Sequence, residues 1–250
     1  MPELAAKQQV KPVICRTSTA LSLHFSWHET QSCMDIRQPD ALNLEYTRTM
    51  MGFLLFVPEP ANIAMVGLGG GSLAKFCHRY LPKTQIRVIE INPHVIALRD
   101  ELQVPPESKR FSVVLGDGAE FMRSTPERFD VLLIDGYDHE GLPAKLSSQR
   151  FYDQCSEALA PGGILVTNLY CGHQRWQQQV EKLRRSFNSA ILVVDDTEGC
   201  NSIVFASETH LSVLPLAKPV RRPRTLDNEA WTQLRTTFSR VLSASRDEAS

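Results

Sequence analysis

The sequence contains no long apolar run, no surplus of charge of one sign and no paired cysteine motif. No apolar run approaches the ~18 residues of a transmembrane helix, and no apolar core of a signal peptide follows Lys7 and Lys11. The formal net charge of -1 indicates no bulk attraction to nucleic acid or to a membrane. The six cysteines are scattered without a CxxC pair, which predicts reduced thiols and no metal site. We therefore expect a cytoplasmic protein that contacts neither nucleic acid nor a membrane.

The sequence does contain a clear change of hydrophobic period. Between Val13 and Asp35, apolar and polar residues alternate, which predicts a small antiparallel β unit. After Pro60, short apolar runs alternate with helical stretches, which is typical of a mainly parallel, doubly wound α/β sheet. We expect seven strands in a Rossmann-like arrangement. The expected parts are an N-terminal β-hairpin unit with a linking helix (1–57), a nucleoside-binding catalytic domain (58–213), and a linker with a C-terminal helix (214–250).

Local signals predict how several of these elements begin and end. Asp40 can cap a helix that carries Leu44 and Met51. Pro161-Gly162-Gly163 is expected to stop a helix and to precede the fifth strand. Two strands near residues 190–194 and 202–206 are expected to form a hairpin, which adds an antiparallel strand at one edge of the sheet.

A glycine-rich turn follows the first strand of the α/β part, at Gly67-Leu68-Gly69-Gly70. Glycines lack a Cβ atom, so a ligand can approach their backbone closely at the positive end of the next helix. Glu90 ends the second strand, where a carboxylate can accept hydrogen bonds from both ribose hydroxyls of an adenosyl group. These two signals predict a nucleoside site. They leave open whether the nucleoside is a dinucleotide or is derived from S-adenosylmethionine.

Asp117 separates these alternatives. It follows the third strand in Gly116-Asp117-Gly118, where its carboxylate can accept a hydrogen bond from the adenine amino group. This arrangement resembles the Rossmann-like superfamily that binds S-adenosylmethionine. A plain structural alternative is that Asp117 caps the helix that follows it, and both roles are compatible.

The end of the fourth strand has the most specific pattern, from Asp135 to Tyr152. It resembles the loop of the polyamine aminopropyltransferases, the spermidine synthase family. Upstream, Gln31 and Tyr46 stand near a glutamine and a tyrosine of that family. The loop residues that match are Asp135, Asp138, Gly141, Leu146, Phe151 and Tyr152.

The resemblance implies transfer of an aminopropyl group from decarboxylated S-adenosylmethionine to a small-molecule amine. The donor could also be intact S-adenosylmethionine, and no metal is required. Asp135 is then the base that takes the amine proton, and Asp138 holds the acceptor or the amino end of the donor. Tyr46 and Gln31 contact substrate, and Gly67, Gly69, Gly70, Glu90, Asp117 and Gly118 contact the nucleoside. The resemblance also implies a homodimer.

Three residues depart from the family pattern. Gly70 replaces an aspartate of the glycine loop, Thr47 replaces a histidine, and His139 replaces a proline. The missing acid at Gly70 bears on the choice of donor. A methyltransferase that uses intact S-adenosylmethionine, and a catalytically silent nucleoside-binding scaffold, are therefore the two alternative interpretations.

Overall fold

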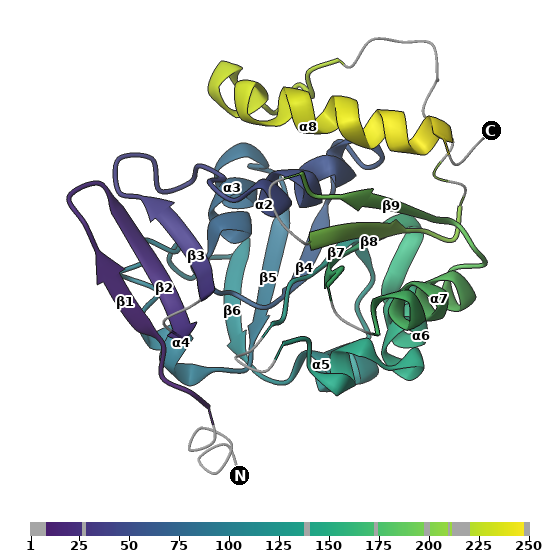
Figure 1. Ribbon diagram of the computed structural model, residues 1–250, viewed down its shortest axis with the longest axis horizontal. Coiled ribbons are helices and arrows are strands. Elements are labelled where there is room, and N and C mark those ends of the chain that lie inside the picture. Colours follow the sequence, from purple (N-terminus) through teal and green to yellow (C-terminus); the bar gives the residue numbers. More distant parts are fainter. Residues whose placement is uncertain are drawn as a thin grey trace.

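The computed structural model describes residues 9–26, 29–137, 141–172, 175–197, 201–209, 211 and 221–247. Over these residues the chain forms a small antiparallel sheet beside a larger sheet flanked by helices (Figure 1). The small sheet has the order β1-β2-β3 and consists of β1 (Val13–Arg16), β2 (Ala20–Ser26) and β3 (Glu29–Asp35). The predicted N-terminal β unit is therefore confirmed.

The larger sheet has seven strands in the order β6-β5-β4-β7-β8-β10-β9. Strands β6, β5, β4, β7 and β8 run parallel, and β10 pairs antiparallel with both β8 and β9. This confirms a mainly parallel, Rossmann-like sheet with an antiparallel edge. The strands are β4 (Asn62–Val66), β5 (Gln85–Glu90), β6 (Phe111–Leu115), β7 (Phe129–Ile134), β8 (Leu159–Tyr170), β9 (Ile191–Asp195) and β10 (Asn201–Ala206).

Helices cover both faces of this sheet. Because successive side chains of a strand point to opposite faces, Met65 of β4 joins one apolar core and Ala64 joins the other. The first core contains residues of α2 (Glu45–Met50), α3 (Ser72–Tyr80), α4 (Pro93–Ala97) and α8 (Asn228–Asp247), with the 3-10 turn η1 (Met51–Leu55). The second contains residues of α5 (Gly118–Ser124), α6 (Gln149–Ala158) and α7 (Trp176–Ser186). Among the described helices, none is both long and apolar enough to span a membrane.

The chain order reverses beside β4. From β4 the chain passes to β5 and β6 on one side, and it then returns to β7 and β8 on the other. In an open α/β sheet, such a point leaves a crevice beyond the carboxyl ends of the strands. Strands β4 and β7 end at Val66 and Ile134. The glycine turn and Asp135 follow these two residues directly, so they lie at the crevice.

The start of α2 differs from its prediction. The helix begins at Glu45 after Leu44, whose side chain provides no cap. Asp40 lies earlier in the chain and pairs instead with Arg79, at 3.7 Å. At Met51 the expected single helix changes to the 3-10 turn η1. The prediction was wrong, because the helix begins five residues after Asp40, too far for its side chain to cap the first turn.

The Pro161-Gly162-Gly163 segment also differs from its prediction. Strand β8 begins at Leu159, directly after α6, and runs through this segment. Gly162 has a φ of +78°, and the pairing with β7 shifts register between Phe129 and Val131. A glycine in this conformation permits a bulge, which bends the strand without ending it. The turn motif therefore lies inside a strand.

Candidate active site

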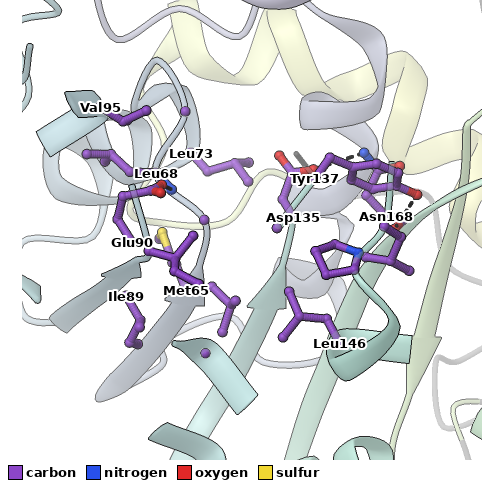
Figure 2. A pocket seen from close by; sticks show the side chains of 18 of the residues that line it. Met65, Leu68, Leu73, Ile89, Glu90, Val95, Asp135, Tyr137, Leu146 and Asn168 are labelled. Carbon is purple, nitrogen blue, oxygen red and sulfur yellow. Dashed lines mark hydrogen bonds between the residues drawn. The ribbon is translucent and has the colours of Figure 1, made fainter. Parts of the chain in front are cut away.

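A cavity of about 580 Å³ opens at the carboxyl ends of the central strands. Figure 2 shows Glu90 on one side of it and Asp135 with Asn168 on the other. Asp138 and the side chain of Gln31 lie outside the described residues, so their predicted roles stay predictions. The predicted site residues that line the cavity are Tyr46, Gly67, Gly69, Gly70, Glu90, Asp117, Gly118 and Asp135.

Glu90 holds the glycine turn in place. Its Oε2 accepts a hydrogen bond from the backbone N–H of Leu68 at 2.8 Å, and its Oε1 accepts one from the N–H of Asn92 at 2.7 Å. Burial raises the pKa of Glu90, and these backbone hydrogen bonds oppose the rise. The backbone N–H groups of Gly69 and Ile91 also hydrogen-bond to this carboxylate. The side chain therefore orders the glycine turn, and it lines the cavity.

Gly67 brings the turn against the end of β7. Its φ is +99°, a left-handed conformation that favours glycine. A Cβ atom at this position would lie 2.3 Å from the carbonyl oxygen of Asp135. Only glycine permits this contact, so the backbone of the turn and the backbone of Asp135 are fixed side by side.

Asp135 is held by two side chains from other elements. The hydroxyl of Tyr46, from α2, donates to Oδ2 at 3.2 Å, and Nδ2 of Asn168, from β8, donates to Oδ1 at 3.0 Å. Burial raises the pKa of Asp135 above its ordinary value, and both hydrogen bonds oppose that rise. Tyr137 donates from its hydroxyl to the carbonyl oxygen of Asn168 at 3.1 Å. The result is an oriented carboxylate with raised basicity at one end of the cavity.

Asn168 was missed by sequence reasoning. It lies near the end of the fifth strand in sequence, and the carboxyl ends of neighbouring parallel strands meet at one edge. The polar side chain after the apolar run Ile164–Val166 was therefore a usable signal. Asn168 is buried, and its Oδ1 has no hydrogen-bond partner within the described part of the chain.

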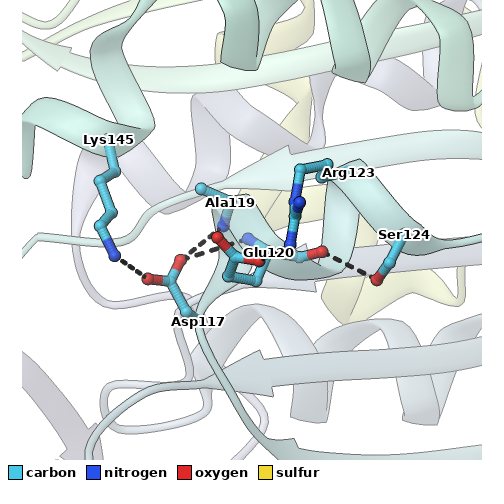
Figure 3. A network of polar contacts seen from close by, with 6 residues as sticks. All are labelled: Asp117, Ala119, Glu120, Arg123, Ser124 and Lys145. Atoms are coloured by element: carbon cyan, nitrogen blue, oxygen red, sulfur yellow. Dashed lines mark hydrogen bonds and ion pairs between the residues drawn. The ribbon is translucent and has the colours of Figure 1, made fainter.

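Asp117 occupies the start of α5, as the capping alternative predicted. Its Oδ1 accepts from the N–H groups of Ala119 at 2.8 Å and Glu120 at 3.4 Å (Figure 3). Its Oδ2 accepts from Nζ of Lys145 at 2.8 Å. Although burial alone would raise the pKa of Asp117, these hydrogen bonds lower it, so the side chain is anionic. Within the described ranges, no three His, Cys, Asp or Glu side chains are grouped so that they could hold a metal ion.

The backbone of Gly70 packs closely against the side chain of Ser32 in β3. A Cβ atom at Gly70 would lie 1.8 Å from the Ser32 hydroxyl oxygen and 2.6 Å from its Cβ. Ser32 is buried and lines the cavity. A neutral hydroxyl therefore fills the space that an acidic side chain at position 70 would need.

Comparison with known proteins places this arrangement in a family. The family model described as "Spermine/spermidine synthase domain" matches residues 43–194 of the chain. The polyamine aminopropyltransferase of Chromobacterium violaceum is 36% identical over 206 residues, which are 82% of this chain and 78% of that protein. The chain belongs to the spermine/spermidine synthase family. It is a transferase of that family, and these matches support aminopropyl transfer in polyamine biosynthesis, as the loop resemblance predicted.

A relative from Neisseria meningitidis serogroup A with the same name is 36% identical over 209 residues, which are 83% of this chain and 80% of that protein. An eEF1A lysine and N-terminal methyltransferase of Mus musculus is more distant. It is 28% identical over 195 residues, which are 71% of this chain but only 28% of that protein. Sequence similarity therefore favours the family prediction over the methyltransferase alternative.

Solved structures share the fold. A probable spermidine synthase from Corynebacterium glutamicum superposes with a TM-score of 0.70 at 22% identity, covering 79% of this chain and 77% of that one. A spermidine synthase in complex with the transition state analogue AdoDATO has a TM-score of 0.60 at 17% identity, covering 89% and 87%. At these identities the similarity establishes the fold alone.

Proposed function

We propose that the chain transfers the aminopropyl group of decarboxylated S-adenosylmethionine to a small-molecule amine. The observation that carries the proposal is Asp135, a carboxylate oriented by Tyr46 and Asn168 across the cavity from Glu90 (Figure 2). The complex of a spermidine synthase of the same fold with AdoDATO supports a donor related to S-adenosylmethionine.

The proposed reaction forms one C–N bond and breaks one C–S bond. The lone pair of the amine attacks the carbon next to the sulfonium, and the C–S electrons leave with sulfur as methylthioadenosine. An alkylamine is largely protonated at neutral pH, because its pKa is near the lysine value of about 10.4. One proton must therefore leave the ammonium before attack. We assign that proton to Asp135, which passes it to water, and the product amine leaves protonated.

The surroundings of Asp135 suit this role. Burial raises its pKa and so strengthens the carboxylate as a base, while the hydrogen bonds from Tyr46 and Asn168 keep the ionised form available. The unpartnered Oδ1 of Asn168 is a further acceptor for an N–H of the incoming ammonium. An oxygen from the residue after β7 and one from β8 would then orient the nitrogen for attack.

The opposite part of the cavity suits an adenosyl group. Glu90 would accept from the ribose hydroxyls, and Asp117 would accept from the adenine amino group. The backbone at Gly67, Gly69, Gly70 and Gly118 allows close approach of the nucleoside. We retain the substrate contacts proposed for Gln31 and Asp138 from the family pattern.

Ser32 bears on donor choice. Decarboxylated donor ends in a bare ammonium, whereas intact S-adenosylmethionine also carries a carboxylate. An acidic pocket attracts the first and repels the second. Asp135 supplies such a charge, but the hydroxyl of Ser32 stands where an acid at position 70 would add to it. We propose a preference for the decarboxylated donor that is smaller than an acid at position 70 would give.

We extend the proposal to a homodimer in the cytoplasm. The family resemblance supports the homodimer. The family supports a small-molecule amine as the acceptor. The net charge of -1 gives no bulk attraction to nucleic acid or to a membrane, so we propose no contact with either.

Titration calorimetry tests the proposal directly. The four ligands are methylthioadenosine, decarboxylated S-adenosylmethionine, intact S-adenosylmethionine and NAD. We expect methylthioadenosine and the decarboxylated donor to bind most tightly. Tight binding of NAD without binding of adenosyl-sulfur compounds would refute it. Tighter binding of the intact donor, together with methylation of an amine, would establish the methyltransferase alternative instead.

A further inference from the structure

Lys145 and Asp117 form a charged pair at the wall of the cavity, on the side of β6. The ammonium of Lys145 donates to Oδ2 of Asp117 at 2.8 Å (Figure 3), and both residues line the cavity. The other oxygen of Asp117 is occupied by the first N–H groups of α5. Oδ2 therefore has one lone pair left, and the ammonium has two N–H groups left.

The main chain at Lys145 is fixed while its head group is accessible. Lys145 lies in the 3-10 turn η2 (Ala144–Ser147), and the next residue, Leu146, is buried in the second core. The Lys145 side chain itself is 70% exposed, whereas that of Asp117 is 21% exposed. The ammonium can therefore reorient toward a ligand without movement of the turn.

The pair presents one hydrogen-bond acceptor and one donor side by side. Adenine presents the complementary pattern, because its 6-amino group is a donor and the neighbouring ring nitrogen N7 is an acceptor. The amide of Asn or Gln reads the same edge with one oxygen and one nitrogen. An acidic oxygen and an ammonium nitrogen 2.8 Å apart offer the same chemistry from two residues.

We propose that Lys145 is a specificity-determining residue that reads the purine together with Asp117. Its ammonium donates to a ring nitrogen beside the 6-amino group, N7 or N1, while Asp117 accepts from the amino group. This inference rests on the proposed adenosyl site and adds a second side chain to base recognition. A 6-oxo purine presents an acceptor where Asp117 needs a donor, so the pair selects adenine over hypoxanthine.

A purely structural role makes a different prediction. If the ion pair only fastens η2 to the start of α5, loss of Lys145 weakens every nucleoside by the same factor. If Lys145 reads a ring nitrogen, its loss matters only for ligands that carry that nitrogen. A ligand that lacks the atom therefore separates the two roles.

The test is calorimetry of methylthioadenosine, its 7-deaza and 1-deaza analogues and methylthioinosine. The proteins are the parent, Lys145→Met and Lys145→Arg. The matched control is Arg123→Met, which removes an ion pair with Glu120 on the same helix, and Arg123 does not line the cavity. We expect Lys145→Met to bind methylthioadenosine about tenfold more weakly, and Lys145→Arg to restore most of this loss.

The deciding quantity is the coupling between loss of the Lys145 ammonium and loss of the purine ring nitrogen. One deaza analogue should bind the parent about tenfold more weakly than methylthioadenosine does, yet bind Lys145→Met with no further loss. Methylthioinosine should bind the parent more weakly still. The inference would be overturned if methylthioadenosine binds the parent and Lys145→Met then loses affinity equally for all nucleosides, or loses none. Failure of methylthioadenosine to bind the parent would overturn the proposed function as well.

Discussion

Replacement of Tyr46 by phenylalanine should raise the pKa of Asp135. In the parent, burial raises this pKa, and hydrogen bonds from Asn168 and Tyr46 lower it. Tyr46→Phe keeps the ring but removes one of the two donors to the carboxylate. The ionised form of Asp135 loses a stabilising contact, so its proton is released at higher pH.

The size of the effect follows from the hydrogen bond. A hydrogen bond to a charged group contributes about 1.5–3 kcal/mol, and one pKa unit corresponds to about 1.36 kcal/mol. The O···O distance of 3.2 Å between Tyr46 and Asp135 is long for a hydroxyl donor, so the lower end applies. We expect the pKa of Asp135 to rise by about one unit.

The assay is the pH dependence of kcat at saturating donor and amine, together with ¹³C carboxyl NMR of Asp135. Assignment of the carboxyl signal comes from its loss in Asp135→Asn. Both measurements should show the acidic transition at higher pH in Tyr46→Phe. Tyr137→Phe is the matched control, because that hydroxyl donates to the backbone of Asn168 and not to Asp135. An acidic transition that stays in place or moves to lower pH in Tyr46→Phe would refute the reasoning.

Three further predictions concern the stability and donor choice of other variants. Gly70→Asp alone should unfold at a lower temperature than the parent, because the new side chain would clash with Ser32. The double variant Ser32→Gly/Gly70→Asp should fold, and its preference for the decarboxylated donor over the intact one should be about tenfold larger than that of Ser32→Gly. An unchanged ratio of the two dissociation constants would contradict this prediction. Arg240→Met removes the ion pair between Arg240 and buried Glu45, so urea unfolding should show a loss of about 3 kcal/mol at pH 7. Burial raises the pKa of Glu45, but hydrogen bonds with Asp196, Arg240 and Thr197 lower it to about 2. The loss should therefore shrink as pH falls from 4.5 toward 2, and a pH-independent loss would count against the ion pair. Asp135→Asn should raise the Tm at neutral pH, because burial disfavours the ionised carboxylate in the folded protein. The gain in Tm should vanish below pH 3.8, where Asp135 is protonated in both the folded and the unfolded protein. A lowered Tm at neutral pH would contradict this prediction.

The sheet could be predicted from sequence because its signals are local. The apolar runs at β4, β5, β6 and β7 have the length and period of buried parallel strands, and the strand ends then follow in order. The same reasoning failed at Asp40 and at Gly162. Asp40 pairs with Arg79, which is distant in sequence, and the strand that contains Gly162 pairs with β7. Neither contact is visible in a local pattern.

The site was predictable only where a motif carries it. Glu90 ends β5, Asp117 follows β6 after one residue and Asp135 directly follows β7. Topology alone therefore brings them to one edge. Ser32 and Asn168 belong to no motif, and Lys145 lies in the Asp135–Tyr152 loop but is not one of its matching residues. Each is defined by the residue that it contacts: Gly70, Asp135 and Asp117. Such pairings depend on the packing of β3, β8 and η2, which no local pattern encodes.

The most direct test of the central claim is product analysis by mass spectrometry with decarboxylated S-adenosylmethionine and a panel of primary amines. The account predicts an aminopropylated amine and methylthioadenosine in equal amounts from the parent. Asp135→Asn should reduce the rate by on the order of 10²–10⁴-fold while methylthioadenosine binds with nearly unchanged affinity. Turnover by Asp135→Asn at the parent rate, or a methylated amine as the product of the parent, would contradict the account.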